Sequence, residues 1–271
     1  MFDRLLPSRK RILMYHRILP DDTPTFVFEA LSGEVVSQSV FQAQLKWLCT
    51  RFTPMPLAEL LACRDREPCF SVTFDDGLVD NLRYALPVLQ SLKIPATIFV
   101  LAAKVGSGEA LAHHQAARKL AADPGAAPDV RERPKVQVRQ YLESSAQGLE
   151  AVHSDDRFLE ADELRQLVLA GVSIQSHGLS HTPLAALSAS AIQAELKESR
   201  RLLQDMTDQP VDYFAYPIGR EAHLIDGGIV KANGYQAAFT AIPGRPRHST
   251  DPFRLPRFGA RNSLAQLQKK I

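Results

Sequence analysis

Two adjacent carboxylates, Asp75 and Asp76, follow an apolar segment at residues 70–74 that reads Phe-Ser-Val-Thr-Phe. Its β-branched and aromatic residues favour a strand. The next residue, Gly77, allows a sharp turn, which breaks the alternation of side chains along a strand. Both carboxylates could then reach one pocket in different roles. On its own, an Asp-Asp-Gly run is more typical of a solvated turn, so its function depends on which other residues reach the same place.

A second polar group contains two histidines four residues apart, His177 and His181. Such spacing can place two imidazoles on one helix face, but Gly178 and Pro183 disfavour a helix and place the pair in a loop after a strand. A lone pair of this kind is more often incidental than functional. Together with a carboxylate, however, two imidazoles form a three-ligand set that leaves positions open on zinc or another divalent ion.

Strand-like and helix-like segments alternate along the chain, which predicts parallel strands joined by crossover helices. The predicted strands cover 11–15, 70–74, 96–101, 172–175, 211–216 and 236–241, with a seventh at 254–258. The predicted helices cover 37–48, 57–62, 78–92, 160–170, 188–206, 221–233 and 263–270, with a kink at Pro87. About seven such strands favour a barrel, in which functional residues gather at the carboxyl ends of the strands.

The polar residues of interest stand at those predicted strand ends: His16, Asp75, Asp76, His177 and Tyr216. Residues 102–156 are the least interpretable part of the chain, because they are rich in alanine and contain three prolines among mixed charges. We predict one or two surface helices there with a flexible excursion. The remaining histidines, at 113, 114, 153, 223 and 248, are predicted to lie on the surface.

The composition is that of an ordinary soluble globular chain, with 45% hydrophobic and 23% charged residues among 271. A formal net charge of +2 argues against a nucleic-acid or membrane partner. No apolar run approaches the roughly 20 residues that span a bilayer, and residues 1–11 are too charged for a secretory signal. Three cysteines without metal-type spacing indicate reduced thiols. We therefore expect a cytoplasmic protein, while a periplasmic or envelope-associated location stays open.

Four short segments resemble the motifs of the polysaccharide deacetylases, also called NodB-homology proteins or family 4 carbohydrate esterases. Thr73–Gly77 matches their first motif, His177–His181 resembles the second, and Phe214–Gly219 resembles the third in a variant that ends Tyr-Pro-x-Gly. Met14–Arg17 is similar to a bacterial branch of the family. The resemblance runs from about residue 12 to residue 259, fits 102–156 poorly, and implies one catalytic domain over 1–271.

The resemblance implies a distorted (β/α) barrel and the metal-dependent removal of acetyl groups from an N-acetylated polysaccharide or glycan precursor. Carried over by position, Asp76, His177 and His181 would bind the divalent ion, by default Zn²⁺ with Co²⁺, Ni²⁺ or Mn²⁺ as alternatives. Asp75 would be the general base, and the backbone N–H of Tyr216 would stabilise the oxyanion.

Three departures from the family pattern affect these expectations. Gly178 replaces a Ser or Thr, which should loosen the loop between the histidines. No arginine that could orient the base precedes Phe214. The closing Leu-x-His motif, which supplies the general acid, has its nearest match in Leu255-Pro256-Arg257, and arginine is a poor proton donor.

Two residues are candidates to fill these gaps. His16 is the candidate replacement acid, and a structural histidine is an equally open reading. Arg257 is expected either to pair with a carboxylate or to anchor the substrate.

Three alternative functions remain at this stage. The same fold and metal could hydrolyse another non-peptide C–N amide. The ligand set alone also suits a non-haem iron oxygenase, although the alternation of strand and helix disfavours that class. A non-catalytic glycan-binding protein on a decayed deacetylase fold is the third possibility. Asp75 argues against the binder, because a binder needs no free carboxylate beside a metal ligand.

Overall fold

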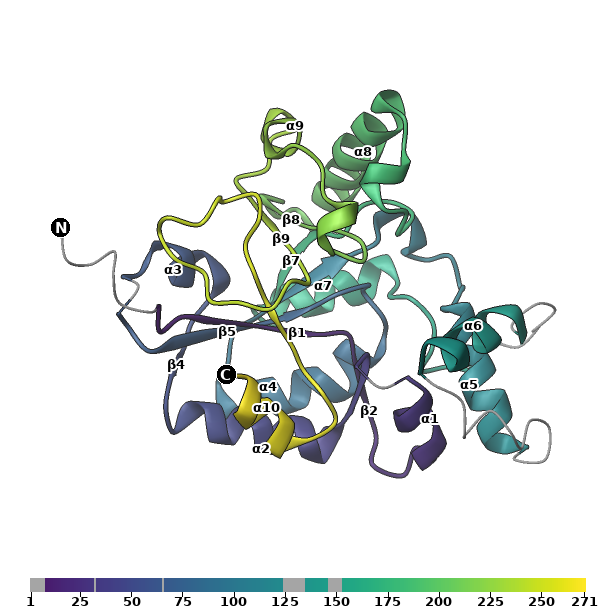
Figure 1. Cartoon of the computed structure of the whole chain (residues 1–271). Coiled ribbons are helices and arrows are strands. Elements are labelled where there is room, and N and C mark those ends of the chain that lie inside the picture. Colours follow the sequence, from purple (N-terminus) through teal and green to yellow (C-terminus); the bar gives the residue numbers. More distant parts are fainter. Residues whose placement is uncertain (1–7, 32, 65, 124–134, 146–152) are drawn as a thin grey trace.

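The structure, a computed structural model, describes residues 8–31, 33–64, 66–123, 135–145 and 153–271. A curled sheet of parallel strands forms its centre, as Figure 1 shows. Seven strands follow one another in the spatial order β10-β1-β5-β6-β7-β8-β9, and β4 pairs with β5 beside this path. The strands are β1 Arg11–Tyr15, β4 Thr53–Pro54, β5 Cys69–Phe74, β6 Ala96–Val100, β7 Ser173–Ser176, β8 Tyr213–Ala215, β9 Ala237–Phe239 and β10 Phe258–Gly259.

The sheet curls into a half-barrel whose two outer strands approach each other. A parallel bridge joins Phe239 of β9 to Leu255, three residues before β10 begins. Every residue of β1, β5 and β6 is buried, as expected for parallel strands that are covered on both faces. The predicted fold class, a (β/α) barrel with about seven parallel strands, is confirmed.

Helices connect and cover these strands. They are α2 Gln38–Cys49, α3 Leu57–Ala62, α4 Leu86–Leu92, α7 Ala161–Leu169, α8 Ala189–Thr207, α9 Gly227–Ala232 and α10 Leu264–Lys270. The apolar stripe of α8 faces the core through residues such as Leu196 and Leu203, which are fully buried. Ser188 caps this helix by accepting a hydrogen bond from the backbone N–H of Ala191. In the part of the chain that the structure describes, no helix is long and apolar enough to cross a membrane.

Two predicted helices are each divided in the structure. The segment predicted at 78–92 is a π-helical turn at Asn81–Ala85 followed by α4. Pro87 lies in the first turn of α4, where its missing N–H has no intrahelical partner to lose. The segment predicted at 221–233 is a single 3₁₀ turn at Glu221–His223 followed by α9. The prolines and glycines predicted the positions of the helix ends, but each predicted helix is interrupted in the structure.

A side unit, which the sequence did not reveal, lies beside the sheet in Figure 1. It combines the parallel pair β2 Arg17–Leu19 and β3 Val35–Ser37 with α1 Thr25–Ala30, α5 Ala112–Ala122 and α6 Lys135–Ser145. A separate apolar cluster holds it together: Leu19, Phe26, Val27, Leu31, Val35, Ala116, Ala117, Val138 and Leu142. One or two helices were predicted within 102–156, and the described residues there form two α-helices, α5 and α6. The predicted flexible excursion falls on 124–134 and 146–152, outside the described residues.

Candidate active site

The predicted polar residues meet in one cleft at the carboxyl ends of the strands. The cleft has a volume of about 790 Å³. Among the residues that line it are six of the seven predicted site residues: His16, Asp75, Asp76, His177, His181 and Tyr216. The first five follow β1, β5 and β7, and Tyr216 follows β8. The seventh, Arg257, lies beneath the cleft rather than in its wall.

A backbone turn gives the two neighbouring aspartates different surroundings. The N–H of Asp75 still donates to the carbonyl of Tyr15 at 3.0 Å, which continues the pairing of β1 and β5. Asp76 then adopts a φ of +77°, in the left-handed region, and Gly77 follows at +81°. This conformation is unfavourable for a residue other than glycine. It turns the two carboxylates away from the alternation of the strand.

Asp76, His177 and His181 form a compact three-residue group, which we call the ion triad. The Nε2 atoms of both histidines lie 3.6 Å from Oδ1 of Asp76. One ligand atom from each residue lies within 4.8 Å of the other two. Oδ1 of Asp76 is buried and has no hydrogen-bond partner among the described residues, and an unpaired buried carboxylate oxygen is costly unless a cation or donor satisfies it.

The protonation of His177 also suits an ion. Its Nδ1 lies 2.8 Å from the carbonyl oxygen of Ala215, which can only accept, so Nδ1 carries the proton and Nε2 presents a lone pair to the ion triad. Burial lowers the pKa of His177 to about 4 against the opposing charges of Asp75 and Asp76. The ring is therefore neutral near pH 7. The donor set of the ion triad fits a divalent ion such as zinc.

The loop that carries His181 is held by Glu195 of α8, a residue that the sequence did not single out. The Glu195 carboxylate accepts from the N–H of Leu179 at 2.6 Å and from the hydroxyl of Ser180 at 2.5 Å. Gly178 has a φ of +86°, and a Cβ there would lie 2.9 Å from Oε2 of Glu195. The expectation that glycine loosens this loop is wrong, because the space of a side chain is taken by the carboxylate that fixes it.

Asp75 is bound by Arg257, which belongs to the far end of the chain. The guanidinium donates two parallel hydrogen bonds, Nη1 to Oδ1 and Nη2 to Oδ2, each 2.7 Å long. It also donates to the carbonyl of Thr240 and the hydroxyl of Thr73. Burial raises the pKa of Asp75, but the charge and the hydrogen bonds of Arg257 oppose it, and the pKa is lowered to about 2. Asp75 is therefore a fixed carboxylate at neutral pH.

This pairing decides between the two expectations for Arg257. The side chain is completely buried, and its guanidinium is occupied by protein acceptors. The prediction that Arg257 binds substrate is wrong, and the alternative, pairing with a carboxylate, is correct. An arginine therefore does contact Asp75, although it comes from a different place in the sequence than the position before Phe214.

His16 also lines the cleft. It lies after β1, beside the Asp75 carboxylate whose pKa it helps to lower. Its Nδ1 is buried without a hydrogen-bond partner among the described residues. A structural histidine would have a hydrogen bond from its ring to a loop. The missing partner therefore favours a functional role for the imidazole ring in the cleft.

Comparisons with known proteins agree with this geometry. Residues 63–238, about two thirds of the chain, match the sequence profile of the family described as polysaccharide deacetylase. The chain belongs to the polysaccharide deacetylase family. It is 26% identical over 245 residues to a Bacillus subtilis protein with the provisional name polysaccharide deacetylase YxkH, a match that covers 88% of this chain and 66% of that protein.

Two solved structures of deacetylases share its fold. The deacetylase PplD of Streptococcus pyogenes, solved with acetate, has a TM-score of 0.71 at 20% identity and covers 98% of this chain and 99% of its own. The polysaccharide deacetylase BC0361 of Bacillus cereus has a TM-score of 0.66 at 22% identity, over 96% of this chain and 68% of that one. At these identities the two structures support the fold of this deacetylase-family chain.

The family's oxyanion donor requires a correction here. The backbone N–H of Tyr216 donates to the carbonyl of Phe239 at 3.0 Å, because pairing with β9 continues one residue past β8. It is therefore not available to an oxyanion. Pro217 has no N–H, and the next residue, Ile218, has an N–H without a partner among the described residues. Ile218 lines the cleft and has a φ of +63°.

Two histidines predicted to be surface residues are instead buried in the side unit. His113 and His114 are 7% and 0% exposed. Their Nε2 atoms lie 2.8 Å and 3.0 Å from the same oxygen, Oε2 of Glu34. Nδ1 of His114 lies 3.0 Å from Nη1 of Arg17, which can only donate. We call Glu34, His113 and His114 the side-unit triad.

The side-unit triad reaches the same cleft, because Glu34 and His113 also line it. His223, which is half-buried, lines it as well. His153 and His248 are exposed, as predicted. The missed residues belong to two segments with no strong local signal, the β2–β3 connection and the start of α5.

Proposed function

We propose that this chain is a metal-dependent hydrolase that removes acetyl groups from an N-acetylated polysaccharide or glycan precursor. The observation that carries the proposal is the contrast between neighbouring aspartates. Asp76 Oδ1 is buried, unpaired and faced by two imidazole nitrogens. Asp75 is ionised and held in place by Arg257. A divalent ion bound by the ion triad would polarise the acetyl carbonyl and lower the pKa of a water molecule.

Asp75 would take the proton from the attacking water. A carboxyl group with a pKa of about 2 is a weak base in isolation, so its value lies in its fixed position rather than its basicity. The two hydrogen bonds from Arg257 hold both carboxylate oxygens and keep the group ionised. Arg257 thus acts as a positioning residue for the base.

The C–O bond of the acetate would form when the water attacks the acetyl carbonyl. His16 would then give a proton to the leaving nitrogen as the C–N bond breaks. The N–H of Ile218 would donate to the oxygen that carries negative charge in the transition state. It is the first peptide N–H after Tyr216 that has no partner among the described residues. Water supplies the oxygen of the released acetate, and a free amine is left on the sugar.

The alternatives are weaker but remain testable. The same residues could hydrolyse another non-peptide amide, and assays with different substrates would then distinguish the two activities. A decayed, glycan-binding fold was plausible while the general acid was missing. The presence of His16 beside Asp75 in the cleft supports a working enzyme instead.

Acetate release from N-acetylglucosamine oligomers with added Zn²⁺ tests the proposal. We expect the wild type to release acetate, and Asp75→Asn to lose at least about 10²-fold in kcat while it keeps its metal. Equal turnover of the wild type and Asp75→Asn would contradict the mechanism. Metal uptake without acetate release from any acetylated sugar would favour the binding protein.

A further inference from the structure

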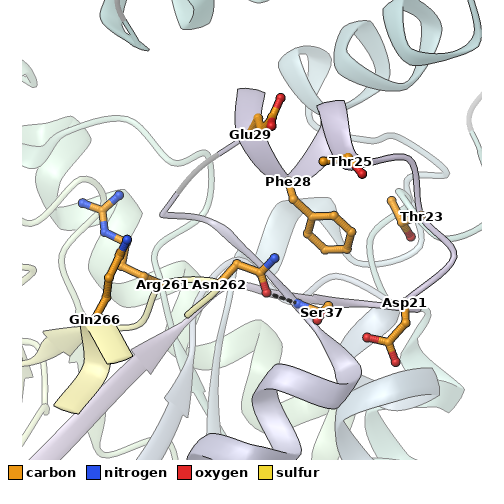
Figure 2. Close-up of a pocket in the computed structure, with 9 residues that line it drawn as sticks. All are labelled: Asp21, Thr23, Thr25, Phe28, Glu29, Ser37, Arg261, Asn262 and Gln266. Atoms are coloured by element: carbon orange, nitrogen blue, oxygen red, sulfur yellow. Dashed lines mark hydrogen bonds between the residues drawn. The ribbon is translucent and has the colours of Figure 1, made fainter. Parts of the chain in front are cut away.

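A second cavity of about 470 Å³ lies next to the cleft, between α1 and the segment that leads into α10. Figure 2 shows the residues that line it: Asp21, Thr23, Thr25, Phe28, Glu29, Ser37, Arg261, Asn262 and Gln266. Eight of the nine carry a hydroxyl, carboxylate, amide or guanidinium group. The exception, Phe28, is half-buried and places its ring among them.

We propose that this cavity is a second sugar-binding site, which holds another unit of the glycan whose acetyl group is in the cleft. This inference rests on the proposed function and adds to it a second place at which the glycan is held.

The lining has the chemistry that a sugar unit requires. A volume of about 470 Å³ is within the range of roughly 300–1,000 Å³ that is typical of small-molecule sites. Sugar hydroxyls both donate and accept, and the cavity offers hydroxyl, carboxylate and amide partners for both roles. The ring of Phe28 offers an apolar face against which the C–H face of a sugar can pack.

Thr23 provides an independent sign of a ligand. It is only 7% exposed, and its hydroxyl has no hydrogen-bond partner among the described residues. A buried hydroxyl without a partner is unfavourable, and nothing on the protein side of the cavity relieves it. A hydroxyl of a bound sugar would supply the missing hydrogen bond.

Arg261 connects the second cavity with the cleft, because its side chain lines both. Its guanidinium packs against Gly33, where an added Cβ would lie 2.7 Å from Nη1. The following residue, Asn262, accepts a hydrogen bond of 2.8 Å from the N–H of Ser37, drawn as a dashed line in Figure 2. One side chain therefore separates two sites that neighbouring units of one glycan could occupy.

The test compares short and long substrates in matched variants. Kinetics with the N-acetylglucosamine monomer and hexamer are measured for the wild type, Phe28→Ala and Thr23→Val, with Zn²⁺ present. Phe52→Ala is the control, because Phe52 is also half-buried but lines neither cavity. We expect Phe28→Ala and Thr23→Val to raise KM for the hexamer by about three- to tenfold and leave the monomer unaffected.

Binding separates this inference from the proposed function. Calorimetric titration of Asp75→Asn protein with the same sugars needs no turnover, and we expect the hexamer to bind more tightly than the monomer only while Phe28 is present. An absence of acetate release by the wild type would contradict the proposed function alone. Equal affinity for both sugars, or an unchanged hexamer affinity in Phe28→Ala, would overturn the second site.

Discussion

Two groups of one carboxylate and two histidines contribute residues to the wall of the same cleft, and they differ in where their protons lie. In the ion triad, the carbonyl of Ala215 accepts a hydrogen bond from the Nδ1–H of His177, so the Nε2 lone pair faces Asp76. In the side-unit triad, Arg17 donates to Nδ1 of His114, so Nε2 must carry the proton and donate to Glu34. The same residue types thus present a set of lone pairs that suits a cation in one place and form a hydrogen-bond network in the other.

The backbone distinguishes the two groups as well. Asp76 and His181 of the ion triad both have left-handed φ values, +77° and +68°, and so does nearby Ile218. No member of the side-unit triad does. Backbone strain tends to persist at functional sites, where the surrounding structure enforces it. The ion triad is therefore built at a conformational cost, whereas the side-unit triad follows ordinary strand and helix geometry.

The side-unit triad has a structural role that follows from Arg17. The buried guanidinium also pairs with Asp80 and Asp156, with N–O distances of 2.8 Å in each case. His114 and Glu34 extend this network from the barrel into the side unit. It links Asp80 and Asp156 to Glu34, which also contacts His113 in the wall of the cleft.

The largest expected effect contrasts the two carboxylates in turnover. Asp76→Ala should lower kcat for acetate release by more than about 10³-fold, because it removes a ligand of the proposed ion. Glu34→Ala, the matched control, should stay within about tenfold of the wild type, provided that circular dichroism shows it to be folded. Comparable losses in the two variants would erase the functional distinction between the triads.

A smaller loss is expected at the proposed acid. His16→Gln should lower kcat by about 10²-fold, the usual contribution of one general acid, with its metal content unchanged. The rate for a substrate with a better leaving group should fall much less, because such a group needs no proton. An unchanged rate on the sugar amide would rule out His16 as the donor.

The pH dependence of stability tests the neutral state of His114. Burial, with the neighbouring His113 charge, lowers its pKa from 6.5 to about 3. Between these values the unfolded chain binds more protons, so the contribution to stability is complete above about pH 6.5 and is lost as the pH falls.

Denaturant titrations should therefore show that the wild type loses about 2 kcal/mol more than His114→Gln between about pH 7 and pH 5. His153→Gln, at an exposed histidine, should show the wild-type slope. A wild-type slope in His114→Gln would mean that His114 is already charged in the folded protein.

The smallest effect concerns strain beside the ion triad. Ile218→Gly should raise the free energy of unfolding by up to about 1 kcal/mol, because glycine accepts a φ of +63° and the side chain is already 42% exposed. Gly219→Ala, one residue on, should lower it, since a Cβ would lie 2.6 Å from the backbone nitrogen of Ala241. A lower stability in Ile218→Gly would show that contacts of the isoleucine outweigh the strain.

The parts of the site that the sequence predicted are those specified by local chemistry. An apolar strand that ends in Asp-Asp-Gly, and two histidines around Gly178, carry their signal within a few residues. The order of strands and helices then placed them at one rim. The parallel strand topology is therefore the part of the fold that could be predicted from the hydrophobic pattern and the positions of proline and glycine.

The parts that were missed depend on contacts between distant residues. Arg257 and Asp75 are 182 residues apart, and no local pattern distinguishes an arginine that orients a base from one that binds substrate. Glu195 lies on a helix with many charges, and its task appears only when the loop from residue 178 to 180 packs against it. Short strands such as β2 and β3 offer too few residues for a pattern.

Metal content tests the central claim most directly. After incubation with Zn²⁺ and removal of the excess, the wild type should retain one ion per chain by elemental analysis. Glu34→Gln should also retain one, and Asp76→Ala should retain none. Zinc retained in full by Asp76→Ala, or lost from Glu34→Gln, would contradict the assignment of the ion to Asp76, His177 and His181.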